Sequence, residues 1–225
     1  PDECILTNPA AMVESATDAT DLRMELPLLV VEPDNTEQVA ELVKLANDMK
    51  FALIPRGGGS GMTGGAVPAR KRTVIVSLTR LTRISPVDLE AMTVTCQAGA
   101  ITQAVINAVD AKGALFSVDP ASKQASTIGG NVSENAGGPS AFEYGTTLDN
   151  LLWWRMVTPT GEIITVEREN HPRHKILPDE TAIFVVKDVS GGVRNVVHLR
   201  GDEIRLPGLG KDVTNKVLGG LPGMQ

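Results

Sequence analysis

The first third of the chain alternates short apolar runs with one amphipathic stretch. Residues 28–31 are uniformly apolar and predict a buried strand. A capping-box pattern then precedes residues 35–50, where apolar side chains recur at helical spacing and predict a helix. Two more mainly apolar runs, residues 51–54 and 74–78, predict further strands. This order of strand, helix, strand, loop and strand is typical of a small α/β unit.

The pattern changes after about residue 83. Residues 93–97 alternate polar and apolar side chains and predict a strand, and residues 101–112 predict a helix that Gly113 ends. Ahead of all these elements, residues 1–27 are polar and irregular. We interpret them as an N-terminal arm or an incomplete N-terminal element.

Two hairpins are predicted in the second half of the chain. The runs 151–157 and 162–166 flank residues 158–161, whose proline and glycine positions fit a type I turn. A second pair of runs, 182–187 and 193–199, flanks a turn rich in glycine and polar residues. Antiparallel strands here, together with the α/β unit before them, predict an α+β fold.

These changes of pattern divide the chain into three parts. Residues 1–27 form the arm, residues 28–83 the first subdomain and residues 84–225 the second. The 225 residues, with 42% hydrophobic and 21% charged side chains, suffice for one large or two small domains. Aromatic residues make up only 3%, so the core must be aliphatic and closely packed.

Charge and hydropathy exclude several classes of protein. A net charge of −6 without a basic block argues against a nucleic-acid partner. No apolar run approaches the ~20 residues that an integral membrane span needs, and no signal peptide is visible from Pro1 onward. We therefore expect a cytoplasmic protein, with any membrane association made through partners.

The cysteine and histidine residues do not predict a metal site. Cys4 and Cys96 are far apart, so they match neither a disulfide framework nor clustered zinc ligands. His171 and His174 have the spacing of a metal-binding pair, but no third ligand stands near them. We interpret that segment as a polar loop and predict no metal ligand.

Residues 55–65 contain six glycines in eleven positions and follow a predicted strand. Glycine has no Cβ, so its backbone can adopt positive φ and can lie directly against a ligand. Successive N–H groups in such a loop can hold a phosphate or a pyrophosphate. The alternative is a flexible surface turn, which the apolar flanks and the stiff, cationic Pro55-Arg56 disfavour.

Residues 59–64 match the dinucleotide fingerprint G-x-G-x-x-G, but the context of that motif is absent. The fingerprint needs a helix that begins within it, whereas two glycines and Pro68 follow here, and no amphipathic stretch precedes the next strand. A nucleotide-triphosphate loop also fails, because no Lys-Ser/Thr pair follows a suitable glycine. Both of these phosphate sites are therefore disfavoured.

A second region of glycine and small polar residues lies at 127–138. Its Asn and Ser side chains can hydrogen-bond a ligand that the backbone touches. The segment 119–122 precedes this region and Tyr144-Gly145 follows it. Two such regions from different subdomains predict an extended ligand held in the crevice between them. The alternative is two unrelated tight loops.

Several motifs occur in one order along the chain: Pro55-Arg56-Gly57-Gly58-Gly59-Ser60-Gly61, Asp119-Pro120-Ala121-Ser122, Thr127-Ile128-Gly129-Gly130-Asn131, Glu134-Asn135-Ala136-Gly137-Gly138 and Tyr144-Gly145. In this order they resemble the FAD-binding domain of the vanillyl-alcohol oxidase / p-cresol methylhydroxylase superfamily. Within it, the resemblance is closest to the branch of the glycolate oxidase flavoprotein subunit and D-lactate dehydrogenase, and it covers roughly residues 28–166. It implies a p-cresol methylhydroxylase-type domain with FAD between two α/β subdomains.

The resemblance also implies roles for individual residues. The first loop would wrap the pyrophosphate, and the second region would contact the pyrophosphate, the ribityl chain and the flavin. The implied FAD-binding residues are Pro55, Arg56, Gly57, Gly58, Gly59, Ser60, Gly61, Gly64, Asp119, Pro120, Ser122, Thr127, Gly129, Gly130, Asn131, Ser133, Asn135, Gly137, Gly138, Tyr144 and Gly145. The implied function is that of a flavin-dependent oxidoreductase, a dehydrogenase or oxidase, whose small-molecule substrate is a 2-hydroxy acid such as lactate or glycolate.

Departures from the family pattern limit what carries over. Many members attach FAD covalently through a His where Ser60 stands, and some add a Cys where residues 124–126 have none, so noncovalent FAD is implied. Residues 167–215 resemble an insertion of large bacterial members with iron–sulfur regions, which would then belong to the full-length protein and not to this chain. Residues 208–223 resemble the approach to the family's last FAD-domain strand. We therefore interpret the chain as a fragment that is incomplete at its C-terminus and inactive without a cap domain.

No catalytic residue is assigned, because the base of relatives comes from a region beyond Gln225 and none of the three histidines fits that role. The electron acceptor is left open as well. The alternative function is a stand-alone nucleotide-binding or interaction module whose ligand is not flavin.

Overall fold

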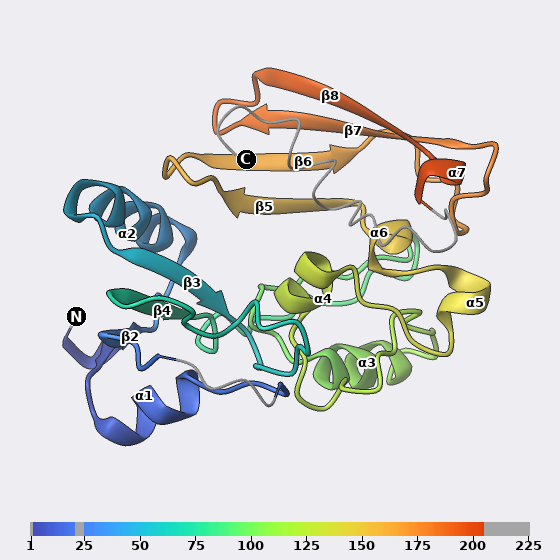
Figure 1. Ribbon diagram of the computed structural model, residues 1–225. Helices are drawn as coiled ribbons and strands as arrows, with labels where there is room; N and C mark the ends of the chain where they lie inside the picture. The colour runs from blue at the N-terminus through green and yellow to red at the C-terminus, as the bar shows by residue number, and fades with distance from the viewer. Residues whose placement is uncertain (1, 21–24, 205–225) are drawn as a thin grey trace. The chain divides into compact units, whose positions relative to one another are not determined.

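The computed structural model describes residues 2–20 and 25–204 of the 225-residue chain. Helices and strands are mixed, and the strands form two sheets of four strands each (Figure 1). This composition agrees with the predicted α+β class. No helix in the described ranges is long and apolar enough to span a membrane.

Packing divides the chain into two compact units. Unit 1 comprises Pro1–Phe116 and Pro120–Asn131, and unit 2 comprises Ser117–Asp119 and Val132–Gln225. The division differs from the boundary that the sequence pattern suggests near residue 83, because most of residues 84–131 belong to the same unit as the N-terminal strands.

Unit 1 contains a sheet with the strand order β1-β2-β4-β3. Its strands are β1 (Ile5–Leu6), β2 (Leu29–Val31), β3 (Ala52–Arg56) and β4 (Thr73–Ser77). The strands β2, β4 and β3 run parallel, and β1 is antiparallel to β2. Every residue of β4 is buried, as expected for a strand with parallel neighbours on both sides. The carboxyl ends of the three parallel strands therefore lie at one edge of the sheet.

The helix α2 (Thr36–Met49) connects β2 to β3, as predicted. Asn35 is its N-cap, and the Oδ1 of Asn35 accepts a hydrogen bond from the N–H of Gln38 at 2.9 Å. The helix ends at Lys50, whose φ of 57° is left-handed.

The N-terminal residues are ordered elements of unit 1 rather than an irregular arm. They form the short 3-10 helix η1 (Asp2–Cys4), the strand β1 and the helix α1 (Pro9–Ser15), which Asn8 caps. The mainly polar composition of residues 1–27 gave no signal for β1, because the stability of this two-residue strand comes from its pairing with β2.

The remainder of unit 1 corrects one predicted strand and confirms one helix. Residues 93–97 form no strand; they take part only in the isolated bridges Ile84↔Cys96 and Asp88↔Thr93. The helix α3 (Thr102–Asp110) is present, and its buried Val105 and Val109 pack in a small core cluster.

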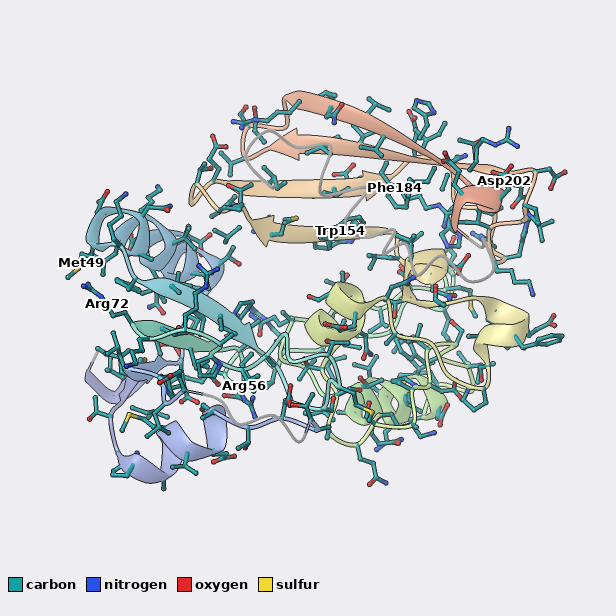
Figure 2. The ribbon with its side chains drawn as sticks, in the orientation of Figure 1. Met49, Arg56, Arg72, Trp154, Phe184 and Asp202 are labelled. Carbon is teal, nitrogen blue, oxygen red and sulfur yellow. The ribbon has the colours of Figure 1, made fainter. Side chains whose placement is uncertain are left out.

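Unit 2 carries both predicted hairpins in one antiparallel sheet with the order β5-β6-β7-β8 (Figure 1). The strands are β5 (Trp153–Val157), β6 (Ile163–Arg168), β7 (Thr181–Asp188) and β8 (Val193–Arg200). Burial alternates along β6 and β7, so one face of the sheet forms the core. Trp154 and Phe184 meet edge to face on that sheet, with ring centroids 5.8 Å apart (Figure 2).

Four short helices complete the described elements: α4 (Ile128–Glu134), α5 (Ala141–Tyr144), α6 (Thr147–Asn150) and α7 (Gly201–Ile204). In the segment that resembles an insertion, β7 pairs directly with β6. The segment 208–223, interpreted as the approach to a final strand, lies outside the described residues.

Candidate functional site

The glycine-rich loop begins where β3 ends, at the carboxyl edge of the parallel sheet. Arg56 pairs with Ser77 in the last register position of β3 and β4. Residues 57–72, all of them described, contain no helix. The loop therefore lacks the helix N-terminus that a Rossmann site uses, as the sequence predicts.

Two of the loop glycines are explained by a neighbouring segment of the same unit. A Cβ at Gly57 would lie 2.2 Å from the Oγ1 of Thr127, and a Cβ at Gly58 would lie 1.7 Å from the backbone oxygen of Ala125. The loop and this segment therefore pack closely at these positions. The two glycine-rich regions thus meet within unit 1 as far as Asn131, whereas the sequence suggested two different subdomains.

Gly59 and Gly61 differ in the space around them. Gly59 has a φ of 63°, and its Cβ would lie 2.3 Å from the Nη2 of Arg56. Gly64, with a φ of 78°, is likewise required by its conformation. At Gly61 a Cβ would meet nothing within 4 Å, and φ lies outside the left-handed region. Neither packing nor conformation therefore requires glycine at position 61.

Arg56 connects the loop to α1. Its Nη1 donates to the carbonyl oxygen of Ala66, and its Nη2 donates to that of Glu14, each at 3.2 Å. Burial lowers the pKa of the half-buried Arg56, while the carboxylates of Asp18 and Glu14 oppose that shift. The guanidinium thus contacts carbonyl groups of the protein.

Buried polar contacts hold the second glycine-rich region. The Nδ2 of Asn131 donates to the Oγ1 of Thr102 at 2.8 Å, and that oxygen lies 2.8 Å from the Oγ of Ser126. Asn131 is only 2% exposed. The N–H of Gly129 donates to the backbone oxygen of Ala98, and a Cβ at Gly129 would lie 2.8 Å from the Cβ of Ala98. These contacts fix the backbone of the region.

Gly130 has more space than Gly129 but less than Gly61. A Cβ there would meet only the Oγ1 of Thr127, at 3.3 Å. The same oxygen accepts a hydrogen bond from the N–H of Gly130, also at 3.3 Å. A side chain at position 130 would therefore have less space than one at position 61.

The other predicted site residues divide between the two units. Unit 1 holds Pro55, Arg56, Gly57, Gly58, Gly59, Ser60, Gly61, Gly64, Pro120, Ser122, Thr127, Gly129, Gly130 and Asn131, and unit 2 holds Asp119, Ser133, Asn135, Gly137, Gly138, Tyr144 and Gly145.

Within unit 2, several of the predicted residues make contacts with the protein itself. A Cβ at Gly138 would lie 2.2 Å from the backbone oxygen of Asp119, and the Oδ1 of Asp119 accepts the N–H of Ser140 at 3.1 Å. Asn135 has a φ of 50°, and its Oδ1 accepts the N–H of Leu148 at 3.0 Å. Packing thus explains glycine at position 138.

Asp149 on α6 is the residue that the sequence interpretation missed. It is 1% exposed. Its Oδ2 accepts the N–H and the O–H of Thr146 at 2.8 and 3.1 Å, and its Oδ1 accepts the N–H of Ile176 at 2.8 Å. Its backbone oxygen accepts a hydrogen bond from Arg168 at 2.9 Å and lies 2.9 Å from the Nε2 of His171. One buried carboxylate therefore joins α6 to the loop after β6.

The same carboxylate explains Gly145. A Cβ at that residue, whose φ is 79°, would lie 2.3 Å from the Oδ2 of Asp149. The capping box between Thr146 and Asp149 is a sequence signal that could have identified the acid.

The titratable groups near these regions form no metal cluster: in the described ranges no three His, Cys, Asp or Glu residues are placed to share an ion. Cys4 and Cys96 are both free thiols. Burial raises the pKa of Cys96 to about 11, so this thiol is protonated at neutral pH. His174 pairs with Glu180 at 2.8 Å instead of facing a ligand group.

Comparison with known proteins decides the family. The FAD binding domain family matches residues 27–167, which is more than half of the chain. The chain belongs to this family. The predicted family and its cofactor, FAD, are thereby confirmed. This FAD-binding domain match includes both glycine-rich regions and all the predicted site residues, whereas α1, β7 and β8 lie outside it.

Relatives of the FAD-binding domain are named after three 2-hydroxy acids. The chain is 35% identical over 147 residues to the glycolate oxidase subunit GlcD of Bacillus subtilis, covering 65% of this chain and 31% of that protein. It is 40% identical over 138 residues to the D-lactate dehydrogenase of Anaerostipes hadrus, covering 61% and 29%. It is 37% identical over 160 residues to the D-2-hydroxyglutarate dehydrogenase of Xanthomonas citri pv. viticola, covering 70% and 33%. The chain thus spans about a third of these relatives.

Solved structures confirm the fold. An alkyldihydroxyacetonephosphate synthase superposes with a TM-score of 0.67 at 27% identity, over 74% of this chain and 33% of that one. p-Cresol methylhydroxylase superposes with a TM-score of 0.62 at 17% identity, over 73% and 32%. The predicted p-cresol methylhydroxylase-type fold is therefore correct.

Proposed function

We propose that this FAD-binding domain is the cofactor module of a flavin-dependent oxidoreductase that acts on a 2-hydroxy acid. The observation that carries the proposal is the family match over residues 27–167, which includes a loop with unexplained space at Gly61. The relatives support the substrate class, because glycolate, lactate and 2-hydroxyglutarate all bear a hydroxyl on the carbon beside a carboxylate.

The residues of unit 1 fit the cofactor. Gly61 leaves an open position where a Cβ would otherwise stand, and backbone N–H groups of such a loop suit a pyrophosphate. The buried Thr102 and Asn131 keep the second region rigid beside the loop. When bound, FAD would supply the electron-accepting chemistry, and the residues of this chain would bind and orient it.

The assignment of the unit 2 residues, such as Asn135 and Tyr144, to the same cofactor remains a prediction. So does noncovalent attachment, which the serine at position 60 supports because a serine hydroxyl replaces the histidine that anchors FAD in many members. No residue of the chain is assigned as catalytic base.

Direct binding measurements test the proposal. Titration of the purified chain with FAD should quench the flavin fluorescence with saturation, and FAD should raise the melting temperature more than NAD does. At a hundredfold excess over its Kd, FAD adds about 2.7 kcal/mol to the free energy of unfolding. Stabilisation by NAD alone would favour the nucleotide module without flavin.

The mode of attachment needs a second experiment. Acid precipitation of the loaded protein should release all flavin to the supernatant. Flavin that stays with the precipitated polypeptide would show a covalent bond and contradict the assignment at Ser60.

A further inference from the structure

We propose that Arg56 is a positioning residue: its two hydrogen bonds, to Ala66 and to Glu14, hold the glycine-rich loop against α1, and it does not itself bind the pyrophosphate. We call this pair of hydrogen bonds the latch. This inference rests on the proposed cofactor site, because it states that the guanidinium beside that site binds carbonyl groups of the protein and not the cofactor. It also gives a role to α1, which lies outside the family match.

The hydrogen bonds of the guanidinium join three segments of chain. Arg56 stands at the end of β3, and its Nη1 reaches the carbonyl of Ala66 across the whole loop. Its Nη2 reaches the carbonyl of Glu14 in the last turn of α1 (Pro9–Ser15). The Glu14 carbonyl also accepts the O–H of Thr17 at 3.1 Å. Carbonyl groups at a helix C-terminus carry partial negative charge, so they favour an additional cationic donor. The latch thus closes the loop and caps the helix together.

Neighbouring groups compensate the charge of Arg56 within the protein. The carboxylates of Asp18 and Glu14 both act on it electrostatically. The backbone of Gly59 lies against the guanidinium, since a Cβ there would stand 2.3 Å from Nη2 and 2.6 Å from Cζ. A pyrophosphate would then be held by backbone N–H groups, with Arg56 as their support.

A lysine cannot reproduce this arrangement. The planar guanidinium presents nitrogens to two carbonyls on different segments, whereas a lysine offers one ammonium group. Arg56→Lys therefore keeps the charge and breaks the latch, and Arg56→Met removes both. If Arg56 formed a direct ion pair with the pyrophosphate, the Kd for FAD would differ between these two variants. If Arg56 acts as a latch, both variants should have a similarly raised Kd.

Arg72 provides a matched control in the same sheet. It too caps a helix, because its Nη2 donates to the carbonyl of Met49, the last residue of α2, at 3.3 Å. It precedes β4, at the edge of the sheet opposite Arg56 (Figure 2). Arg72→Lys therefore weakens a comparable cap away from the glycine-rich loop.

The experiment compares Arg56→Lys, Arg56→Met and Arg72→Lys with the wild-type chain. Hydrogen exchange of the ligand-free proteins should be faster across residues 9–16 and 57–66 in both Arg56 variants and unchanged there in Arg72→Lys. The Kd for FAD should rise about tenfold or more in both Arg56 variants, in line with the loss of charge-assisted hydrogen bonds. The salt dependence of Kd between about 50 and about 500 mM should match wild type, because no ligand contact of the cation is lost.

Two results would overturn the inference. One is near-wild-type FAD affinity in Arg56→Lys with a large loss and a flatter salt dependence in Arg56→Met, which is the signature of a direct ion pair. The other is unchanged exchange of the loop in both variants. Asp18→Asn adds an independent check. It removes a negative charge that acts on Arg56 and leaves the two hydrogen bonds of the latch in place, so the affinity for FAD should stay the same. Tighter binding would show that the cation acts on the ligand.

The outcomes separate the inference from the proposed function. If the wild-type chain binds no FAD, the proposed function fails, and the exchange measurements alone still decide whether the latch exists. If wild type binds FAD and Arg56→Lys behaves like it, only the latch is wrong.

Discussion

The loop glycines at positions 58 and 61 offer a test in which the same added methyl group should have opposite consequences. Replacing either residue with alanine adds one Cβ. At Gly58 that atom would lie 1.7 Å from the backbone oxygen of Ala125, whereas at Gly61 it would meet nothing within 4 Å. Gly58→Ala therefore disturbs the fold, and Gly61→Ala should disturb only a ligand.

The magnitudes follow from these distances. Overpacking against a backbone atom costs about 1–3 kcal/mol, so Gly58→Ala should lower the free energy of unfolding by that amount. Gly61 has no left-handed φ, and alanine at such a site stabilises by about 0.4–1 kcal/mol through the unfolded state. If the pyrophosphate lies against position 61, the methyl group should weaken FAD binding about tenfold or more, which is about 1.4 kcal/mol.

Two measurements separate the effects. Urea unfolding of the ligand-free variants gives the stability difference, and fluorescence titration with FAD gives the Kd under conditions where each variant is folded. Wild-type FAD affinity in Gly61→Ala would refute the placement of the ligand. A loss of stability in Gly61→Ala equal to that in Gly58→Ala would refute the geometric reasoning itself.

Three further predictions concern the rest of the chain. Asp149→Asn should lower the free energy of unfolding by about 1–3 kcal/mol, because an amide cannot accept all the hydrogen bonds of the buried carboxylate. Urea unfolding should show a smaller loss for Asp188→Asn, at the less buried last residue of β7. The pKa of His171 is lowered mainly by burial and also by Arg168, so as pH falls the imidazole is protonated in the unfolded chain before it is protonated in the folded one. The free energy of unfolding should therefore fall as pH drops below about 6.5, and His171→Asn should make it depend less on pH. Cys96, with a pKa of about 11, should react slowly with iodoacetamide near pH 8 and rapidly in urea, as followed by mass spectrometry; equal rates would contradict its burial.

Elements governed by local periodicity could be predicted from the sequence. The helix α2 and the two hairpins were predicted because their apolar spacing and turn residues are local signals. The strand β1 could not be, since two residues become a strand only by pairing with β2. For residues 93–97 the sequence predicted a strand that is absent. Their side chains alternate as in a strand, but no continuous neighbouring strand pairs with them.

The candidate site shows even more clearly that the sequence alone does not predict contacts between distant segments. The order of the glycine motifs was enough to indicate the family, which the match over residues 27–167 confirmed. The sequence could not show which glycines face a ligand, because a missing Cβ looks the same whatever occupies its place.

Only the tertiary structure shows where the protein itself fills the space beside a glycine. It puts Ala125 against Gly58 and Asp149 against Gly145, and it leaves position 61 open. It likewise shows that Arg56 donates to two carbonyls, one of them on Glu14, which lies far away in sequence. The sequence determined which residues carry backbone freedom and charge; the fold decided, through contacts between distant segments, which of them the protein itself uses.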